Sequence, residues 1–243
     1  MRGIARERLS GNFGTTIRAY VWSRVIMVCI TWLSMSISQS GTGGRVFYVI
    51  IYFLSLIITG IFDAGSAFLY LHVVSGREAS PGMVFSCFRN HTDKTVLITL
   101  YRLLLEALAS ITFAYAYVQY VINGQSGYLG LSAIGLIVMI AGYLLIWAIY
   151  LPAYYLIHDF PDYGALEIIR LCPKLTLPRL GRMVMLFVGM IPLKLLEVLS
   201  LGVGAPWAES YVNAIMAEYY LDLMNPGLIP AGPQEAVIRQ GAE

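Results

Sequence analysis

The sequence predicts an all-α, polytopic membrane protein with six transmembrane helices. Of its 243 residues, 58% are hydrophobic and only 12% are charged, whereas a soluble domain contains about 25% charged residues. The apolar residues occur in blocks of roughly twenty or more, the length that crosses a hydrocarbon core about 30 Å thick. A membrane β-barrel would instead show alternating segments of about ten residues. A helical membrane protein is therefore expected.

The first two spans are expected at about 17–38 and 46–74. The first apolar run is longer than the 7 to 15 apolar residues typical of a signal peptide, and Arg24 interrupts it. A glycine-rich connection leads to the second run, which contains Asp63. Both runs are therefore interpreted as spanning helices.

The next two spans are expected at about 95–122 and 129–157. They follow a polar interval at 75–95 that contains a short helix with an apolar stripe, which is typical of a helix lying in the membrane interface. The third span contains Arg102 and Glu106, four residues apart.

The last two spans are expected at about 182–201 and 206–223. A second short helix, at about 163–172, precedes them. Lys194 and Glu197 lie in the middle of the fifth span. A charged group in hydrocarbon costs a few kcal/mol at a helix centre, so such residues usually face protein or water and have partners.

The placement of basic residues predicts the orientation of the chain. Among residues 1–224, Lys and Arg other than Arg24, Arg102 and Lys194 gather in or next to three intervals on one side, with only Arg45 on the other. These residues are Arg2, Arg6, Arg8 and Arg18, then Arg77, Arg89 and Lys94, then Arg170, Lys174, Arg179 and Arg182. By the positive-inside rule, both termini are cytoplasmic.

The order of these features suggests an internal repeat. Residues 1–224 are expected to form one transmembrane domain of three parallel helix hairpins, at about 1–75, 76–158 and 159–224, with short interfacial cytoplasmic helices. In the second and third copies, the odd-numbered span contains a basic residue followed by an acidic one. Residues 225–243, rich in Pro and Gly, are expected to form a flexible tail.

Seven ionisable residues inside the expected spans are the candidate binding residues. They are Arg24, Asp63, Arg102, Glu106, Lys194, Glu197 and Glu218. Pairs at i, i+4 and i, i+3, such as Arg102 with Glu106 and Lys194 with Glu197, can meet on one helix face. Two interpretations remain open: a polar cavity in the inner half of the membrane, or ion pairs that only hold the helices in register.

The sequence offers no positive sign of catalysis, metal binding or nucleic-acid binding. It contains no HExxH, Gly-x-Ser-x-Gly or Walker A motif. The three cysteines form no CxxC pair, and the three histidines lie near the expected membrane edges. With a net charge of +2 and no basic patch, the chain is not expected to bind nucleic acid. No catalytic residue, cofactor or metal is predicted.

Three stretches resemble a family of six-span bacterial integral membrane proteins described as domain of unknown function 975. They are 5–13, which reads ARERLSGNF, then Asp159-Phe160-Pro161, and 201–220, which contains LGVG, Trp207, Tyr211 and AEYY. The resemblance implies a multi-pass protein of a bacterial cell membrane. It implies no established activity.

The function expected from the sequence is transport, or the handling of a lipid or small solute, through the inner-half polar cavity. The alternative is a non-catalytic membrane scaffold or regulatory subunit that acts through its cytoplasmic interfacial helices. Membrane lipids are the expected partners in both cases, and another membrane or cytoplasmic protein is a further partner in the second.

Overall fold

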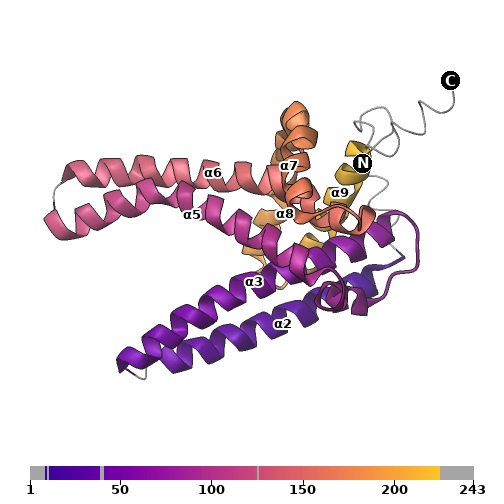
Figure 1. Cartoon of the computed structure of the whole chain (residues 1–243), viewed down its shortest axis with the longest axis horizontal. Helices are drawn as coiled ribbons and strands as arrows, with labels where there is room; N and C mark the ends of the chain where they lie inside the picture. Colours follow the sequence, from indigo (N-terminus) through magenta and orange to yellow (C-terminus); the bar gives the residue numbers. More distant parts are fainter. Residues whose placement is uncertain (1–8, 10, 39–40, 125, 225–243) are drawn as a thin grey trace.

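Two long helical hairpins dominate the computed structural model, which describes residues 9, 11–38, 41–124 and 126–224. The first hairpin pairs α2 (Phe13–Ser38) with α3 (Gly41–Val74), and the second pairs α5 (Thr92–Asn123) with α6 (Ser126–Asp159). The hairpins meet at one end and diverge toward the other (Figure 1). We call the end that contains Val74, Thr92 and Asp159 the base, and the opposite ends the tips.

These four helices are long and apolar enough to cross a membrane. At 1.5 Å per residue, α3, α5 and α6 are about 50 Å long and exceed a hydrocarbon core of about 30 Å. Their apolar side chains are exposed toward the tips, as at Phe47 and Ile122. An exposed apolar surface of this extent is unfavourable in water, so the four helices fit a membrane protein, as the sequence predicts.

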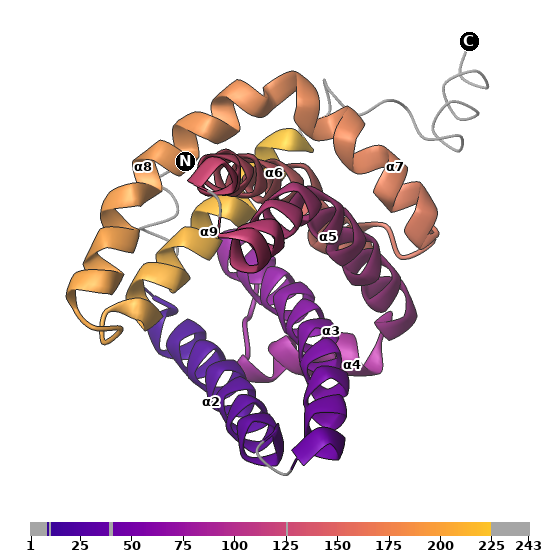
Figure 2. The ribbon, with the colours of Figure 1, turned by 90° about the vertical axis from the view of Figure 1, so that its left-hand side faces the viewer.

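Shorter helices surround the base. They are η1 (Pro81–Phe85), α4 (Ser86–Arg89), α7 (Ala165–Thr176), η2 (Leu177–Arg179), α8 (Leu180–Leu199) and α9 (Ala205–Leu223). Figure 2 shows α7 and α8 as an arc around the outside of the hairpins. In the same view α6 is seen nearly end-on, whereas α8 and α9 are seen lengthwise, so α8 and α9 cross the direction of α6.

The predicted fifth and sixth spans correspond to α8 and α9, which differ from the other four. They have 20 and 19 residues, and each contains three charged residues. Neither is among the helices that length and apolar composition identify as spans. Four spanning helices are therefore supported, and six spans stay a prediction.

A packed core lies at the base, where α3, α6, α7 and α9 meet. Its fully buried members include Leu156, Ile168, Ile215 and Tyr219. α7 buries one face, with Ile168, Ile169 and Cys172, and exposes the other, with Arg170 and Lys174. Burial of these apolar side chains therefore holds the elements together at the base.

The short helix η1 packs closely on α3 because α3 has a glycine at the contact. A Cβ atom added at Gly65 would lie 1.9 Å from the carbonyl oxygen of Val84. No side chain fits in that space, so the approach of the two backbones requires glycine.

Most predicted helix bounds agree with the structure. The short helix expected within 75–95 is present as η1 with α4, and the one expected at about 163–172 is present as α7. Pro152 lies within α6, which continues past it.

A short helix precedes both α5 and α8, but the threefold repeat and the single domain stay predictions. The tail at 225–243 lies outside the described residues.

Candidate functional site

A cavity of about 1200 Å³ lies between the two hairpins, α8 and α9. Most of its lining side chains are apolar and come from α6 and α8, such as Trp147, Leu151, Phe187 and Ile191. Ligand sites in proteins are concave and mostly apolar, with a few polar groups that orient the ligand. The cavity has this character and is the candidate site.

Five charged residues line this cavity, each from a different helix. They are Arg24 of α2, Asp63 of α3, Arg102 of α5, Lys194 of α8 and Glu209 of α9. The three basic residues that the sequence places in odd-numbered spans therefore reach one shared cavity.

These five residues belong to two clusters, which also contain Glu197 and Glu106. The first, which we call the α8–α9 cluster, consists of Arg24, Lys194, Glu197 and Glu209. The Nζ atom of Lys194 donates to Glu209 at 2.6 Å and to Glu197 at 3.1 Å. Glu209 also lies 4.0 Å from Nη2 of Arg24, whose guanidinium is 5.1 Å from the centre of the Tyr20 ring. Glu209 thereby connects α9 to both α2 and α8.

The second, which we call the α3–α5 cluster, consists of Asp63, Arg102 and Glu106. Nε of Arg102 is 3.2 Å from Oε1 of Glu106, and its Nη1 is 4.0 Å from Oδ2 of Asp63. The guanidinium also lies 5.8 Å from the centre of the Tyr154 ring, and the Tyr154 hydroxyl hydrogen-bonds Thr99 at 3.2 Å. These contacts hold Arg102 between α3, α5 and α6.

The predicted pairs within single helices are present, at spacings of four residues (Arg102 and Glu106) and three (Lys194 and Glu197). Glu106 and Glu197 contact residues that line the cavity but do not line it themselves. Glu218 is buried, near the other end of α9, and also lies outside the lining. The structure thus brings six of the seven predicted residues into the two clusters.

Glu209 is the charged residue that sequence reasoning missed. It lies across the α8–α9 turn from Lys194, 15 residues along the chain. In an antiparallel helix pair, two residues at similar distances from a tight turn face each other. Gly202 and Gly204, which mark the turn between Lys194 and Glu209, were therefore the signal that could have identified this pair. Tyr154 and Asn213 also line the cavity and carried no comparable signal.

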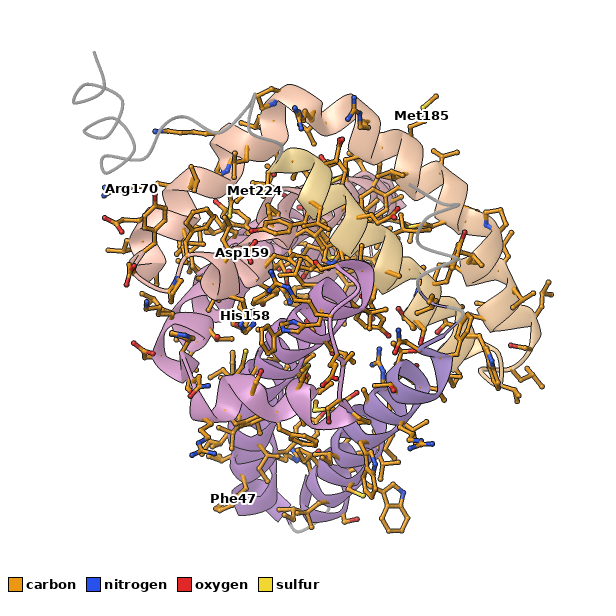
Figure 3. All side chains as sticks on the ribbon, turned by 90° about the vertical axis from the view of Figure 1, so that its right-hand side faces the viewer. Phe47, His158, Asp159, Arg170, Met185 and Met224 are labelled. Carbon is orange, nitrogen blue, oxygen red and sulfur yellow. The ribbon has the colours of Figure 1, made fainter. Side chains whose placement is uncertain are left out.

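A second group of polar side chains lies at the base, outside the cavity. His158 Nε2 is 3.1 Å from the carbonyl oxygen of Ala64 and 3.4 Å from Sγ of Cys87, and its ring stacks on Phe68. Figure 3 shows His158 inside the base next to Asp159. Asp159 accepts a hydrogen bond from the Tyr220 hydroxyl at 2.7 Å. Among the described residues, no group of three or more His, Cys, Asp or Glu is arranged to hold a metal ion.

The start of α8 is fixed to the end of α9 at the base. Arg182 pairs with the Asp222 carboxylate, and Arg179 donates to the Asp222 carbonyl oxygen at 3.0 Å. With the Lys194–Glu209 pair nearer the turn, α8 is attached to α9 at two levels. Polar contacts to α9 therefore hold α8 at two levels, in addition to the apolar packing of Met183 and Met190 in the core.

Comparison of the chain with protein-family models, with curated proteins and with solved structures gave no match.

Proposed function

We propose that the chain is a multi-pass membrane protein that binds a lipid, or a small lipid-like solute, in the cavity between its hairpins and α8, and moves or presents it. The observation that carries this proposal is the combination of an apolar lining with five charged residues in one space of about 1200 Å³. An amphipathic ligand satisfies both kinds of surface at once.

The depth of the α3–α5 cluster supports a lipid ligand. Asp63 lies about 33 Å along α3 from Gly41, and Arg102 about 32 Å along α5 from Asn123, at 1.5 Å per residue. If the tips lie at one face of a hydrocarbon core about 30 Å thick, both residues lie near its other face. A bound lipid would then keep its headgroup at the level of membrane headgroups.

The finer features of the proposal come from the sequence. They are six spans including α8 and α9, cytoplasmic termini, a bacterial cell membrane, and kinship with the domain of unknown function 975. The lengths of α8 and α9, about 30 and 28 Å, match the hydrocarbon thickness and support six spans.

Photocrosslinking tests the binding site. The full chain in lipid nanodiscs would be irradiated with a phospholipid that carries a diazirine in its acyl chain, and the modified peptides would be identified by mass spectrometry. We expect modification of the cavity-lining segments of α6 and α8, and a loss of most of it in Leu145→Trp, which adds bulk at a lining position.

Ile137→Trp is the matched control, because Ile137 is exposed on the same helix and outside the cavity lining. Modification spread evenly along all apolar faces, and unchanged in Leu145→Trp, would refute binding in the cavity.

A scaffold or regulatory role is the second candidate, and the exposed face of α7 supports it. Leu166, Arg170 and Lys174 lie on this face, and Figure 3 shows Arg170 pointing outward. This role predicts that one protein co-purifies in a fixed ratio and is lost from the double variant Arg170→Glu, Lys174→Glu. Retention of that protein by the double variant would contradict it.

A further inference from the structure

The two charged clusters expose opposite charges to the cavity. In the α8–α9 cluster the basic side chains are the exposed ones, with 58% of Arg24 and 47% of Lys194 accessible, while Glu209 is 17% accessible. In the α3–α5 cluster the order is reversed, because Asp63 is 48% accessible and Arg102 only 17%. The α8–α9 cluster therefore presents cations to the cavity, and the α3–α5 cluster presents a carboxylate.

The formal charge of the clusters disfavours a purely anionic ligand. The α8–α9 cluster contains two basic and two acidic residues, and the α3–α5 cluster contains one basic and two acidic residues. Together they carry no excess of positive charge. A ligand with a single negative headgroup would meet Asp63 as a like charge, which is unfavourable in a partly desolvated site.

We infer that the ligand of this cavity is a zwitterionic amphiphile with a phosphate and a primary ammonium group, as in a phosphoethanolamine lipid; this rests on the proposed function. Arg24 and Lys194 bind the phosphate, since guanidinium and ammonium groups both form charge-assisted hydrogen bonds with phosphate oxygens. Asp63 accepts hydrogen bonds from the ammonium group. The acyl chains lie against the apolar lining of α6 and α8.

The ammonium must carry N–H donors for Asp63 to recognise it by hydrogen bonding, and a primary ammonium carries the most. A primary ammonium has three N–H donors, whereas a quaternary ammonium, as in choline, has none. The exposed carboxylate of Asp63 therefore distinguishes a phosphoethanolamine lipid from a phosphocholine lipid, and its charge rejects an anionic phosphoglycerol lipid.

Native mass spectrometry of the full chain in detergent tests this inference. The protein would be titrated with phosphatidylethanolamine, phosphatidylglycerol and phosphatidylcholine of the same acyl chains. We expect phosphatidylethanolamine to bind about tenfold more tightly than the other two, the ratio expected for one charge-assisted hydrogen bond. Glycerophosphoethanolamine, which has no acyl chain, shows by competition whether the free headgroup is bound as well as the lipid.

Two variants assign the two sides of the cavity. Asp63→Asn removes the carboxylate, so it should abolish the preference for phosphatidylethanolamine over phosphatidylglycerol. Arg24→Gln removes a phosphate ligand, so it should weaken the binding of both lipids by a similar factor and leave the ratio of their affinities unchanged. Asp93→Asn is the matched control, because Asp93 is exposed in the first turn of α5 and lies outside the cavity lining.

The outcomes separate this inference from the proposed function. If lipids crosslink in the cavity but the three headgroups bind equally, or phosphatidylglycerol binds most tightly, the zwitterionic ligand is refuted and lipid binding stands. If no lipid crosslinks there, the proposed function fails and this inference fails with it. If Asp63→Asn does not fold, the relative affinities of the three lipids for the unmodified chain and for Arg24→Gln still test the inference.

Discussion

A single glycine determines how closely η1 approaches α3. Because an added Cβ at Gly65 would overlap the carbonyl oxygen of Val84, which is backbone and cannot rotate away, Gly65→Ala must displace η1. We expect it to lower the free energy of unfolding by about 1 to 3 kcal/mol, as for overpacked cores, and to lower the melting temperature in detergent.

Gly130→Ala is the control for this substitution. Gly130 also lies inside a helix, α6, but an added Cβ there meets nothing within 4 Å. Alanine is favoured over glycine in a helix by about 1 kcal/mol, so this variant should melt at the same temperature or higher. Equal melting temperatures for the two variants would contradict the tight contact at Gly65.

Burial should keep two of the three cysteines unreactive. Cys172 is fully buried on α7, and burial raises the pKa of its thiol to about 12; burial also raises the pKa of Cys87. A raised pKa lowers the thiolate fraction, and the thiolate is the reactive form. Cys172 should therefore stay unlabelled by maleimide from pH 7 to 9 and become labelled in denaturing detergent.

Arg89→Cys provides the internal reference for this labelling, because Arg89 is exposed on α4 and outside the four apolar spans. Peptide mass spectrometry should find the introduced cysteine modified in the folded protein under the conditions that spare Cys172. Labelling of both cysteines at the same rate would mean that α7 does not cover Cys172 in solution.

Part of the site could be predicted from residue spacing, and part could not. The pairs of Arg102 with Glu106 and of Lys194 with Glu197 follow from helical periodicity alone. The approach of Asp63 to Arg102 depends on how α3 packs on α5, and that of Glu209 to Arg24 on how α9 packs on α2. Such contacts between elements leave no local pattern in the sequence.

At the scale of elements, Glu209 is expected to matter more than Glu197 for the attachment of α8. Both accept a hydrogen bond from Lys194, but Glu197 lies on the same helix, whereas Glu209 joins α9 to α8 and α2. Glu209→Gln should therefore cost about 1 to 3 kcal/mol, because it leaves two basic groups less well paired in a partly buried place.

Glu197→Gln is the matched control, with an expected cost of about 0.5 kcal/mol for a pair within one helix. Chemical unfolding in detergent, and proteolysis at the α8–α9 turn, measure the two effects. A larger cost for Glu197→Gln would show that Glu209 does not hold α8 against its neighbours.

Helix bounds were the most predictable feature at this scale. The long apolar runs and the polar intervals between them predict the six long helices and the short ones. The course of α8 and α9 across α6 was not predictable, because apolar periodicity gives the length of a helix and not its direction. That direction depends on contacts such as Arg182 with Asp222, which are far apart along the chain.

For the whole molecule, the distribution of burial separates a packed base from exposed tips. The core residues lie on the base halves of α3 and α6 and on α7 and α9, whereas the tips of both hairpins expose apolar side chains. In a bilayer, lipid would cover the tips and the base would lie at one face. The charged clusters lie between these two regions, where apolar and polar ligand groups would both be accommodated.

The position of the α8–α9 turn decides between four and six spans. Leu201, in this turn, is 94% exposed, and Leu199 and Val203 beside it are also exposed. If α8 and α9 both span, the turn lies on the same membrane face as the tips. Since the basic intervals before α5 and before α8 are expected on the other face, we expect Leu201→Cys and Asn123→Cys to be accessible from one side and Arg89→Cys from the opposite side.

Labelling of intact cells with a membrane-impermeant maleimide measures the side from which each introduced cysteine is accessible. The three native cysteines, Cys29, Cys87 and Cys172, are first changed to serine. Six spans predict that Leu201→Cys and Asn123→Cys are labelled from outside and that Arg89→Cys is labelled only after lysis. If Leu201→Cys instead behaves like Arg89→Cys, then α8 and α9 do not cross, and their course across α6 places the cavity wall at the inner face of the membrane. The cavity would then open toward that face, which changes the route of its ligand but not the charges that bind it.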